Sequence, residues 1–337
     1  MNSSNAFLEG GREITALGKK RSISRTERIL PAVIFHRKYL WGKSQELFIK
    51  LERTYTDLLI SYHPCFQHFT TKSIAECCFK ECENKYYVCR PKTFLFNKIE
   101  LLQNLKHIAC SNAVIIKPSN SSCCNGIYIP TSDTLQHILE QIQWSHYDNY
   151  IIQELVKKPV LYNGKKFDLR VYALITSLNP LTYTIYKEGV TRIAAKKYEK
   201  TKLQDPLISL TGSTFRKRLG IKPENITITQ LLEYLKENGY HIDDFWDKVD
   251  KVLRNVFKCF ALYCHKNKAN MKRRFFLIGA DLILKNLDNH NDSFKIVFLE
   301  MNHVPQLEDW GKEVDLALLS IHHQWLTDIW KLWRRTD

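Results

Sequence analysis

The sequence predicts an α+β fold with mainly antiparallel sheets and a helical N-terminal part. Two strand-like runs, 167–176 and 181–187, are separated by an Asn-Pro pair that is typical of turns, so they are expected to form a hairpin. A second hairpin is expected from the strand-like runs 275–284 and 294–302, which a polar segment joins. Apolar residues at mixed three- and four-residue spacing indicate helices through most of residues 29–105.

Shorter elements complete the predicted fold. Ser132 or Asp133 can cap a helix whose apolar face is formed by Leu135, Ile138, Leu139 and Ile142. The same patterns predict strands at 113–117, 126–129 and 150–155, and helices at 228–239, 243–267 and 314–333.

The composition is that of a soluble globular protein of 337 residues, 44% hydrophobic and 25% charged, which is long enough for two or three packed lobes. No run of about 18 apolar residues occurs, so a membrane span is not expected. Residues 1–28 lack the apolar stretch of a secretory signal and are interpreted as a flexible basic lead-in. The ten cysteines are therefore expected to be free thiols, and the irregular spacing of Cys77, Cys78, Cys82 and Cys89 favours buried thiols over a zinc site.

The chain is strongly basic. Lys and Arg total 50 against 35 for Asp and Glu, which gives a formal charge of +15, with local clusters at 19–28 and 216–218. Such a charge predicts an acidic partner, and by itself does not choose among nucleic acid, an anionic membrane and an acidic protein. Nucleic acid is not expected, because the sequence has no recognised binding module and no basic stripe interleaved with aromatic residues.

Three oxygen-bearing side chains are expected to converge on the second hairpin. Asp281 interrupts an apolar strand, and Glu300 and Asn302 lie two residues apart on the partner strand, on one face of the sheet. Folding the hairpin brings Asp281 within about one residue of the position opposite Glu300. Neighbouring carboxylates in apolar strands repel each other unless a cation lies between them, and oxygen ligands suit Mg²⁺. The alternative is a solvated face of an edge hairpin.

A second pattern combines cations with a carboxylate. In GKKFDLR, Lys166, Asp168 and Arg170 alternate with apolar residues, so one face of the strand carries positive, negative and positive charge. Two cations around a carboxylate can bind phosphate and a carboxylate substrate together. Taken alone, the pattern is more often cross-strand ion pairing on a solvated face.

A third pattern is a loop of small residues between two strands. In KPSNSSCCNGIYI, Lys117 ends one strand, and the following loop can fold over phosphate through backbone N–H groups and the hydroxyl of Ser121 or Ser122. With Gly126 as the one glycine, the loop is a weak phosphate signal and matches neither a Walker loop nor GxGxxG.

Taken in this order, the motifs resemble the tubulin tyrosine ligase-like family. The resemblance runs through KPSNSSCCNGIYI, the segment from IIQELVKKPV to RIAAKKY, LTGSTF, FFLIGADLIL and VFLEMNHVPQLE, and covers roughly residues 85–310. It implies an ATP-grasp-like fold with ATP held between two lobes. The chain would then divide into the lead-in 1–28, an N-terminal helical part 29–90, a central lobe 91–155 and a C-terminal lobe 156–337 that carries the Mg²⁺ site.

The resemblance also implies roles for individual residues. It implies that ATP is bound by Lys117, the loop with Ser121, Ser122 and Gly126, the adenine-lining segment Gln153, Glu154, Leu155 and Val156, and Lys166, Asp168 and Thr211. Arg170 and Lys166 would be catalytic, and Arg170, Arg192 and Thr214 would bind the amino-acid substrate. Asp281, Glu300 and Asn302 would ligate Mg²⁺, in agreement with the hairpin argument.

The activity implied by the resemblance is an ATP- and Mg²⁺-dependent ligase that phosphorylates a protein carboxylate, after which the amino group of a free amino acid attacks the acyl phosphate. Glutamate added to the acidic tails of tubulin is the expected reaction, and glycine or tyrosine ligation and another acidic acceptor are alternatives. A monomer in the cytoplasm, on microtubules of the cytoskeleton including those of a cilium or basal body, is expected.

Two departures from the family pattern lie in the segments expected to bind ATP. Cys123, Cys124 and Asn125 stand where the family has Arg-Gly-x, and Gly212 stands where it has Asn after Leu-Thr. His303 and Val304 also replace small residues. A catalytically dead microtubule-binding protein is therefore the rival interpretation, whereas the intact metal ligands and the Lys-Asp-Arg strand favour an active enzyme.

Overall fold

A computed structural model gives the fold of the chain. It describes residues 33–35, 59–61, 64–96, 114–121, 124–131, 134, 137, 150–267, 274–287, 290–303, 305–306 and 310–334. The predicted lead-in 1–28, the helix that Ser132 or Asp133 was expected to cap, and Ser122 lie outside these residues.

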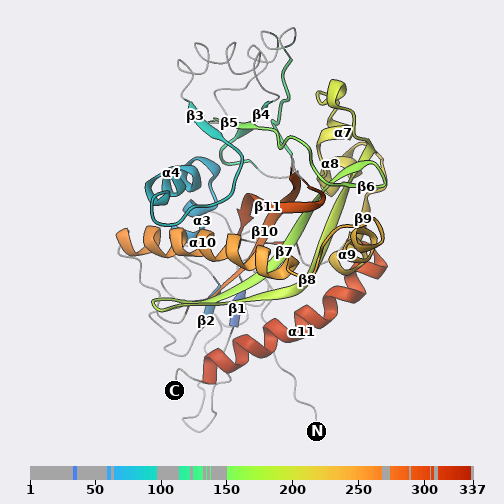
Figure 1. Cartoon of the computed structure of the whole chain (residues 1–337). Helices are drawn as coiled ribbons and strands as arrows, with labels where there is room; N and C mark the ends of the chain where they lie inside the picture. Colours follow the sequence, from blue (N-terminus) through green and yellow to red (C-terminus); the bar gives the residue numbers. More distant parts are fainter. Residues whose placement is uncertain are drawn as a thin grey trace, which may run out of the picture.

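The centre of the molecule is a six-stranded antiparallel sheet, the main sheet, with strand order β11-β10-β7-β8-β9 and β6 paired to β7 (Figure 1). Its strands are β6 (Leu161–Tyr162), β7 (Lys165–Leu178), β8 (Leu181–Lys197), β9 (Glu224–Thr227), β10 (Phe276–Leu287) and β11 (His290–Asn302). Both predicted hairpins are confirmed, because β7 pairs with β8 and β10 pairs with β11. The prediction ended β8 at residue 187, whereas the strand continues to Lys197.

Alternation along β7 divides the main sheet into two faces. One face packs into the larger core through Phe167, Leu169, Val171, Ala173 and Ile175. The other face is apolar only in its second half, where Tyr172 and Leu174 enter a smaller core. Asp168 and Arg170 precede these two residues on the same side of the strand, so a buried polar site adjoins the smaller core.

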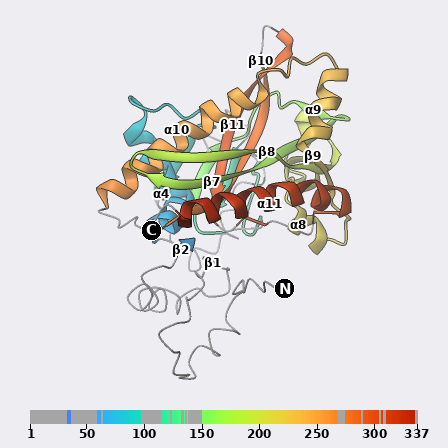
Figure 2. The ribbon, with the colours of Figure 1, turned by 90° about the horizontal axis from the view of Figure 1, so that it is seen from below.

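Two long helices cover opposite faces of this sheet (Figure 2). α10 (Phe245–Lys266) packs on the larger core, together with α9 (Ile228–Glu237). α11 (Lys312–Arg334) covers the other face with Val314, Leu318, Ile321, Trp325 and Ile329, which recur at helical spacing. These elements confirm three predicted helices, and none of the described helices is both long and apolar enough to cross a membrane.

A smaller antiparallel sheet has the order β3-β5-β4 and lies beyond one end of the main sheet (Figure 1). Its strands are β3 (Thr93–Phe96), β4 (Val114–Pro118) and β5 (Tyr150–Glu154), and the last two were predicted. The predicted strand at 126–129 is wrong: only a single bridge joins Tyr128 to Ile116. Gly126 has a φ of +65°, which turns the chain out of the extended conformation just before this bridge.

The described segments of the N-terminal part include strands as well as helices. α3 (Pro64–Phe69) and α4 (Lys72–Cys82) are helical as predicted, and they pack on α10. β1 (Val33–Phe35) and β2 (Leu59–Ser61), however, form a parallel pair, so the expectation of helices is wrong at these two segments and at β3. Pairing between segments this far apart leaves no periodic signal in three-residue runs. Of the clustered cysteines, Cys78 and Cys82 are buried and Cys77 is exposed.

Candidate functional site

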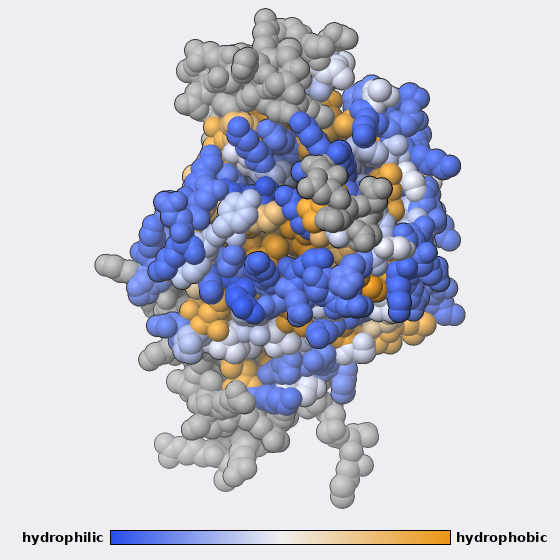
Figure 3. All heavy atoms as spheres, in the orientation of Figure 1, coloured by the Kyte–Doolittle hydropathy of each residue, from blue (hydrophilic) through white to orange (hydrophobic). Residues whose placement is uncertain are grey.

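A cleft of about 700 Å³ lies between the smaller sheet and the polar end of the main sheet. This volume lies within the range of small-molecule and cofactor sites. The visible face of the molecule is mostly hydrophilic, with hydrophobic atoms gathered in a hollow near its centre (Figure 3).

The cleft brings together nearly all the residues that the sequence predicted for the site. Those that line it are Lys117, Ser121, Gln153, Glu154, Leu155, Val156, Lys166, Asp168, Arg170, Arg192, Thr211, Thr214, Asp281, Glu300 and Asn302. Gly126 does not line the cleft, although its neighbours Asn125 and Ile127 do. It belongs to the loop beside the cleft.

Four buried charges form a continuous chain across the main sheet. Arg192 donates to both Asp168 oxygens, at 2.6 and 2.9 Å, and to Asp281 at 2.9 Å. Arg170 donates to both Asp281 oxygens, at 2.5 and 3.1 Å. Strand register creates this chain, because Asp168 lies opposite Arg192 and Asp281 lies opposite Arg170. Cross-strand ion pairing is therefore confirmed, but on a buried face rather than a solvated one.

The ion pairs keep Asp281 and both arginines charged despite burial. Burial alone would raise the pKa of the Asp281 carboxyl, but Arg170 and Arg192 hold that pKa well below its ordinary value. Burial opposes the charge of Arg192, yet Asp168 and Asp281 raise its pKa. Since a buried ion survives only with close partners, the chain fixes the positions of both arginines before any ligand binds.

Two lysines in the cleft are held differently, by neutral oxygens. Lys117 Nζ donates to Gln153 Oε1 at 2.9 Å, and Lys166 Nζ donates to the carbonyl oxygen of Ser209 at 2.7 Å. Burial lowers the pKa of both ammonium groups, that of Lys166 to about 8. Attraction by Glu300 opposes the shift at Lys117 and attraction by Asp168 opposes it at Lys166, whereas repulsion by Lys117 lowers the pKa of Lys166 further. Neither lysine forms an ion pair with a carboxylate among the residues that the structure describes. They are the cations best placed to receive an incoming anion.

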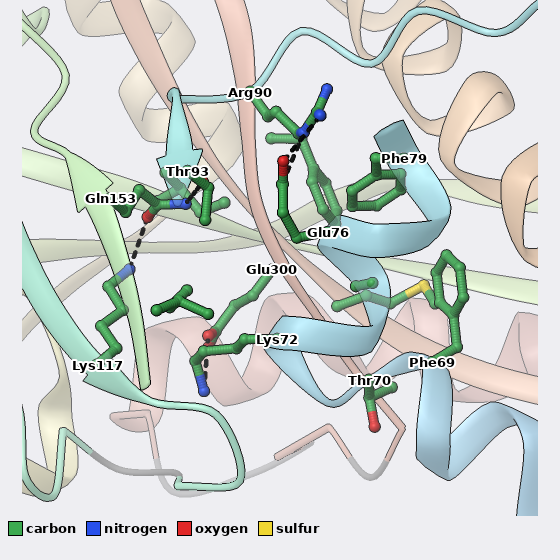
Figure 4. A pocket seen from close by; sticks show the side chains of 15 residues that line it. Phe69, Thr70, Lys72, Glu76, Phe79, Arg90, Thr93, Lys117, Gln153 and Glu300 are labelled. Atoms are coloured by element: carbon green, nitrogen blue, oxygen red, sulfur yellow. Dashed lines mark hydrogen bonds and ion pairs between the residues drawn. The ribbon is translucent and has the colours of Figure 1, made fainter. Parts of the chain in front are cut away.

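A small recess opens from the cleft beneath Lys117, and Figure 4 shows the side chains that line it. The Gln153 amide bridges Lys117 and Thr93, because its Nε2 donates to Thr93 Oγ1 at 3.1 Å. Arg90 and Glu76 close the inner end with two hydrogen bonds of 2.9 and 3.0 Å (Figure 4). The recess has a volume of about 30 Å³, which is large enough for about one water molecule. Its part in the site is to orient Lys117.

Lys72 is a cleft residue that the sequence reasoning missed. It begins α4, and its Nζ donates to the carbonyl oxygen of Ser121 at 2.7 Å and lies 3.6 Å from Glu300 (Figure 4). The neighbouring Ser73 N–H donates to Ser119 Oγ at 3.0 Å, so the helix start and the loop after β4 are fixed to each other. No local signal identified Lys72, because the predicted N-terminal helices were assigned to a part outside the site.

The predicted metal ligands lie together as the hairpin argument required. Asp281 lies directly opposite Glu300 in the β10–β11 register, and Asn302 Nδ2 is 3.5 Å from Asp281 Oδ2. The set is two carboxylates and an amide; among the described residues no group of three or more His, Cys, Asp and Glu side chains could hold a metal ion. Oxygen donors of this kind fit Mg²⁺, which is bound through one or two carboxylates and keeps other positions for phosphate and water.

The two departures from the family pattern contact each other. A Cβ atom added to Gly212 would lie 2.6 Å from Cys124 Sγ, so the thiol occupies the space that a side chain at 212 would need. Cys124 has a φ of +60°, and burial raises the pKa of its thiol, which keeps it neutral. Asn125 accepts a hydrogen bond from Arg218. The altered loop is thus matched to the altered segment that it packs against.

The chain matches the model of the tubulin-tyrosine ligase family over residues 50–320. It is 28% identical over 212 residues to "Probable beta-tubulin polyglutamylase" of Tetrahymena thermophila, covering 57% of this chain and 17% of the relative. It is 26% identical over 250 residues to "Tubulin polyglutamylase TTLL7" of Xenopus tropicalis, covering 67% and 26%. For "Tubulin glycylase 3C" of Tetrahymena thermophila the identity is 28% over 207 residues, covering 58% and 18%. The chain spans less than a third of the length of these relatives.

Proposed function

This chain belongs to the tubulin-tyrosine ligase family, and we propose that it is an ATP- and Mg²⁺-dependent ligase that adds glutamate to carboxylates of tubulin tails. The observation that carries the proposal is the division of cations in the cleft. Lys117 and Lys166 are half-buried and form no ion pair with a carboxylate in the part of the chain that the structure describes, while Arg170 and Arg192 are fixed by Asp168 and Asp281. A site for phosphates therefore lies beside a site for carboxylates.

In this proposal the lysines bind the ATP phosphates. The adenine lies along Gln153, Glu154, Leu155 and Val156, the segment that leads from the smaller sheet into the main sheet. Asp168 and the hydroxyl of Thr211, which donates to Asp168 at 2.5 Å, hold the nucleotide. Asp281, Glu300 and Asn302 would hold Mg²⁺, which neutralises charge on the transferring phosphoryl group when bound. Because these groups are in place beforehand, little reorganisation is needed when charge develops.

The reaction then proceeds through an acyl phosphate. An acceptor carboxylate attacks the terminal phosphorus of ATP and releases ADP. The amino group of the free amino acid attacks the acyl carbon, an amide bond forms, and phosphate leaves. Arg192 and Thr214 orient the amino acid, and Arg170 lies between the carboxylate and phosphate positions. The two arginines stabilise the negative charge of the amino-acid carboxylate and of the transferring phosphoryl group.

Glutamate is preferred over glycine because polyglutamylases predominate among the named relatives, although a glycylase is also similar. The formal charge of +15 favours an acidic acceptor such as the tubulin tail, through attraction that salt weakens. A location on microtubules follows from that acceptor.

The test is mass spectrometry of purified tubulin incubated with the protein, Mg-ATP and glutamate, glycine or tyrosine in turn. A mass increase of one or more glutamate residues is expected. Glu300→Gln should abolish it, and Glu313→Gln, the same change at an exposed position of α11, should not. A mass increase with glycine alone would show that glycine, and not glutamate, is the amino acid that is added. No increase with any amino acid, while ATP binds, would indicate another acceptor, and no ATP binding would indicate the catalytically dead rival.

A further inference from the structure

Arg216 is a buried cation behind the cleft. It lies in α8 (Ser213–Arg218), beside α7 (Pro206–Ser209) at one end of the main sheet (Figure 1). Its side chain is 1% exposed and is among the largest fully buried side chains of the described residues. Its neighbours in the same basic cluster, Lys217 and Arg218, are exposed. Arg216 therefore does not belong to the solvated surface that the sequence pattern indicated.

The guanidinium of Arg216 has few partners for a buried charge. It forms no ion pair with any described residue, and its Nε has no hydrogen-bond partner. Burial lowers the pKa of Arg216, and nearby Asp168 and Glu224 offset this only in part. An apolar side chain of similar length would fill the same space without the cost of burying a cation. Space filling alone thus gives no reason for a guanidinium at this position.

The hydrogen bond that Arg216 does make leads directly to the cleft. Its Nη2 donates to the carbonyl oxygen of Thr211 at 3.2 Å. The Thr211 hydroxyl donates to Asp168 Oδ2 at 2.5 Å, and the same oxygen accepts from Arg192 at 2.9 Å. Arg216 thus holds the carbonyl group of Thr211. The hydroxyl of Thr211 in turn binds Asp168, which is the carboxylate that holds Arg192.

We propose that Arg216 is a positioning residue of this site: by fixing Thr211, it orients Asp168 and so places Arg192 for the carboxylate of the amino-acid substrate. The inference rests on the proposed function, because the substrate carboxylate is assigned to Arg192 there. Arg216 itself does not line the cleft and touches no substrate. Its effect should appear in substrate affinity rather than in turnover.

The test compares Arg216→Met with Arg216→Lys and with Lys236→Met, a loss of charge at an exposed position of α9. Steady-state kinetics with tubulin give kcat and the KM for the amino acid. We expect Arg216→Met to raise this KM about tenfold with kcat within about twofold, since one hydrogen bond in the chain is lost. Arg216→Lys should recover most of the affinity, because an ammonium group can donate to the same carbonyl. Lys236→Met should match the wild type.

Two further readouts separate positioning from a general structural role. In a Thr211→Val background, which removes the hydroxyl, Arg216→Met should raise KM by much less than tenfold. Hydrogen–deuterium exchange of residues 206–214 should increase in Arg216→Met and not in Lys236→Met. Equal KM effects in both backgrounds, a loss confined to kcat, or unchanged exchange would overturn the inference. If the wild-type protein ligates nothing, the proposed function fails, and the exchange comparison still decides whether Arg216 fixes Thr211.

Discussion

The free energy that it costs the folded protein to keep Lys166 charged in the cleft can be measured. Burial lowers the pKa of Lys166 from 10.5 to about 8, and Lys117 repels it. The substitution Lys166→Met keeps the length of the side chain and removes the ammonium group. If Lys166 is there to bind phosphate, its removal should make the empty protein more stable and the nucleotide complex weaker.

The magnitude follows from the pKa difference. The difference between a pKa of 10.5 and one of about 8 corresponds to at most about 3.5 kcal/mol, and solvent reduces it because Lys166 is partly exposed. The variant loses the hydrogen bond to Ser209, which contributes about 1 kcal/mol. The net gain in free energy of unfolding at pH 7 is therefore about 1–2 kcal/mol, or roughly 1.5–3 °C in Tm for a chain of 337 residues.

The pH dependence of unfolding tests the sign of this stability difference independently. Between pH 8 and 10.5 the unfolded chain keeps the Lys166 proton while the folded protein has lost it, so wild-type stability rises with pH across this interval. The stability advantage of Lys166→Met should accordingly be largest below pH 8 and should vanish near pH 10.5.

Thermal unfolding of both proteins at pH 7, 8, 9 and 10 measures this advantage, and calorimetric titration with a non-hydrolysable ATP analogue measures binding. Lys165→Met is the matched control, because Lys165 is paired with Glu224 at 2.6 Å and its loss should give no gain. A variant at position 166 that is less stable than wild type at pH 7, or an advantage that does not change with pH, would refute the argument.

Two further predictions concern buried contacts of the cleft. Asp281→Asn leaves two buried guanidinium groups without a full counter-charge, so unfolding free energy should fall by about 3–5 kcal/mol, and an unchanged Tm would contradict the ion-pair chain. Gly212→Ala places a Cβ atom 2.6 Å from Cys124 Sγ and should cost about 1–3 kcal/mol. Adding Cys124→Gly should restore the Tm of Gly212→Ala, and a double variant no more stable than the single one would show that the thiol is not the obstacle.

The hairpins of the main sheet were predictable because each joins two long strand-like runs through a turn signal or a short polar segment. The predicted strand ended at Lys187, just before Glu188 and Gly189. In the fold Glu188 instead accepts hydrogen bonds from the backbone N–H groups at the start of α9, at 2.8 Å for Ile228. A Cβ atom on Gly189 would lie 2.3 Å from the carbonyl oxygen of Arg170, so the glycine allows β8 to pass close to β7. Both features depend on tertiary neighbours that the local pattern does not contain.

The polar set of the cleft was predictable to the extent that strand register determines it. Asp281, Glu300 and Asn302 were brought together by counting along a hairpin, which requires only the turn and the period of two. Lys72 and Arg216 could not be found in this way, since each reaches the site from a helix whose placement depends on packing across the whole molecule. From the sequence alone, a basic residue on a short helix is expected to lie on the surface, and only the structure shows that it is buried.

The cations of the cleft are held in two ways, and this difference suggests two tasks. Arg170 and Arg192 have carboxylate partners within 3 Å, so an anion that they bind must share or displace those partners. Lys117 and Lys166 donate hydrogen bonds only to neutral oxygens among the described residues, and the attraction of Glu300 and Asp168 does not offset the hydration that the two lysines lose. An anion therefore gains more free energy at the lysines than at the arginines. It follows that nucleotide affinity should depend mainly on the lysines, whereas the arginines, already fixed in place, should govern the orientation of whatever carboxylate reaches them.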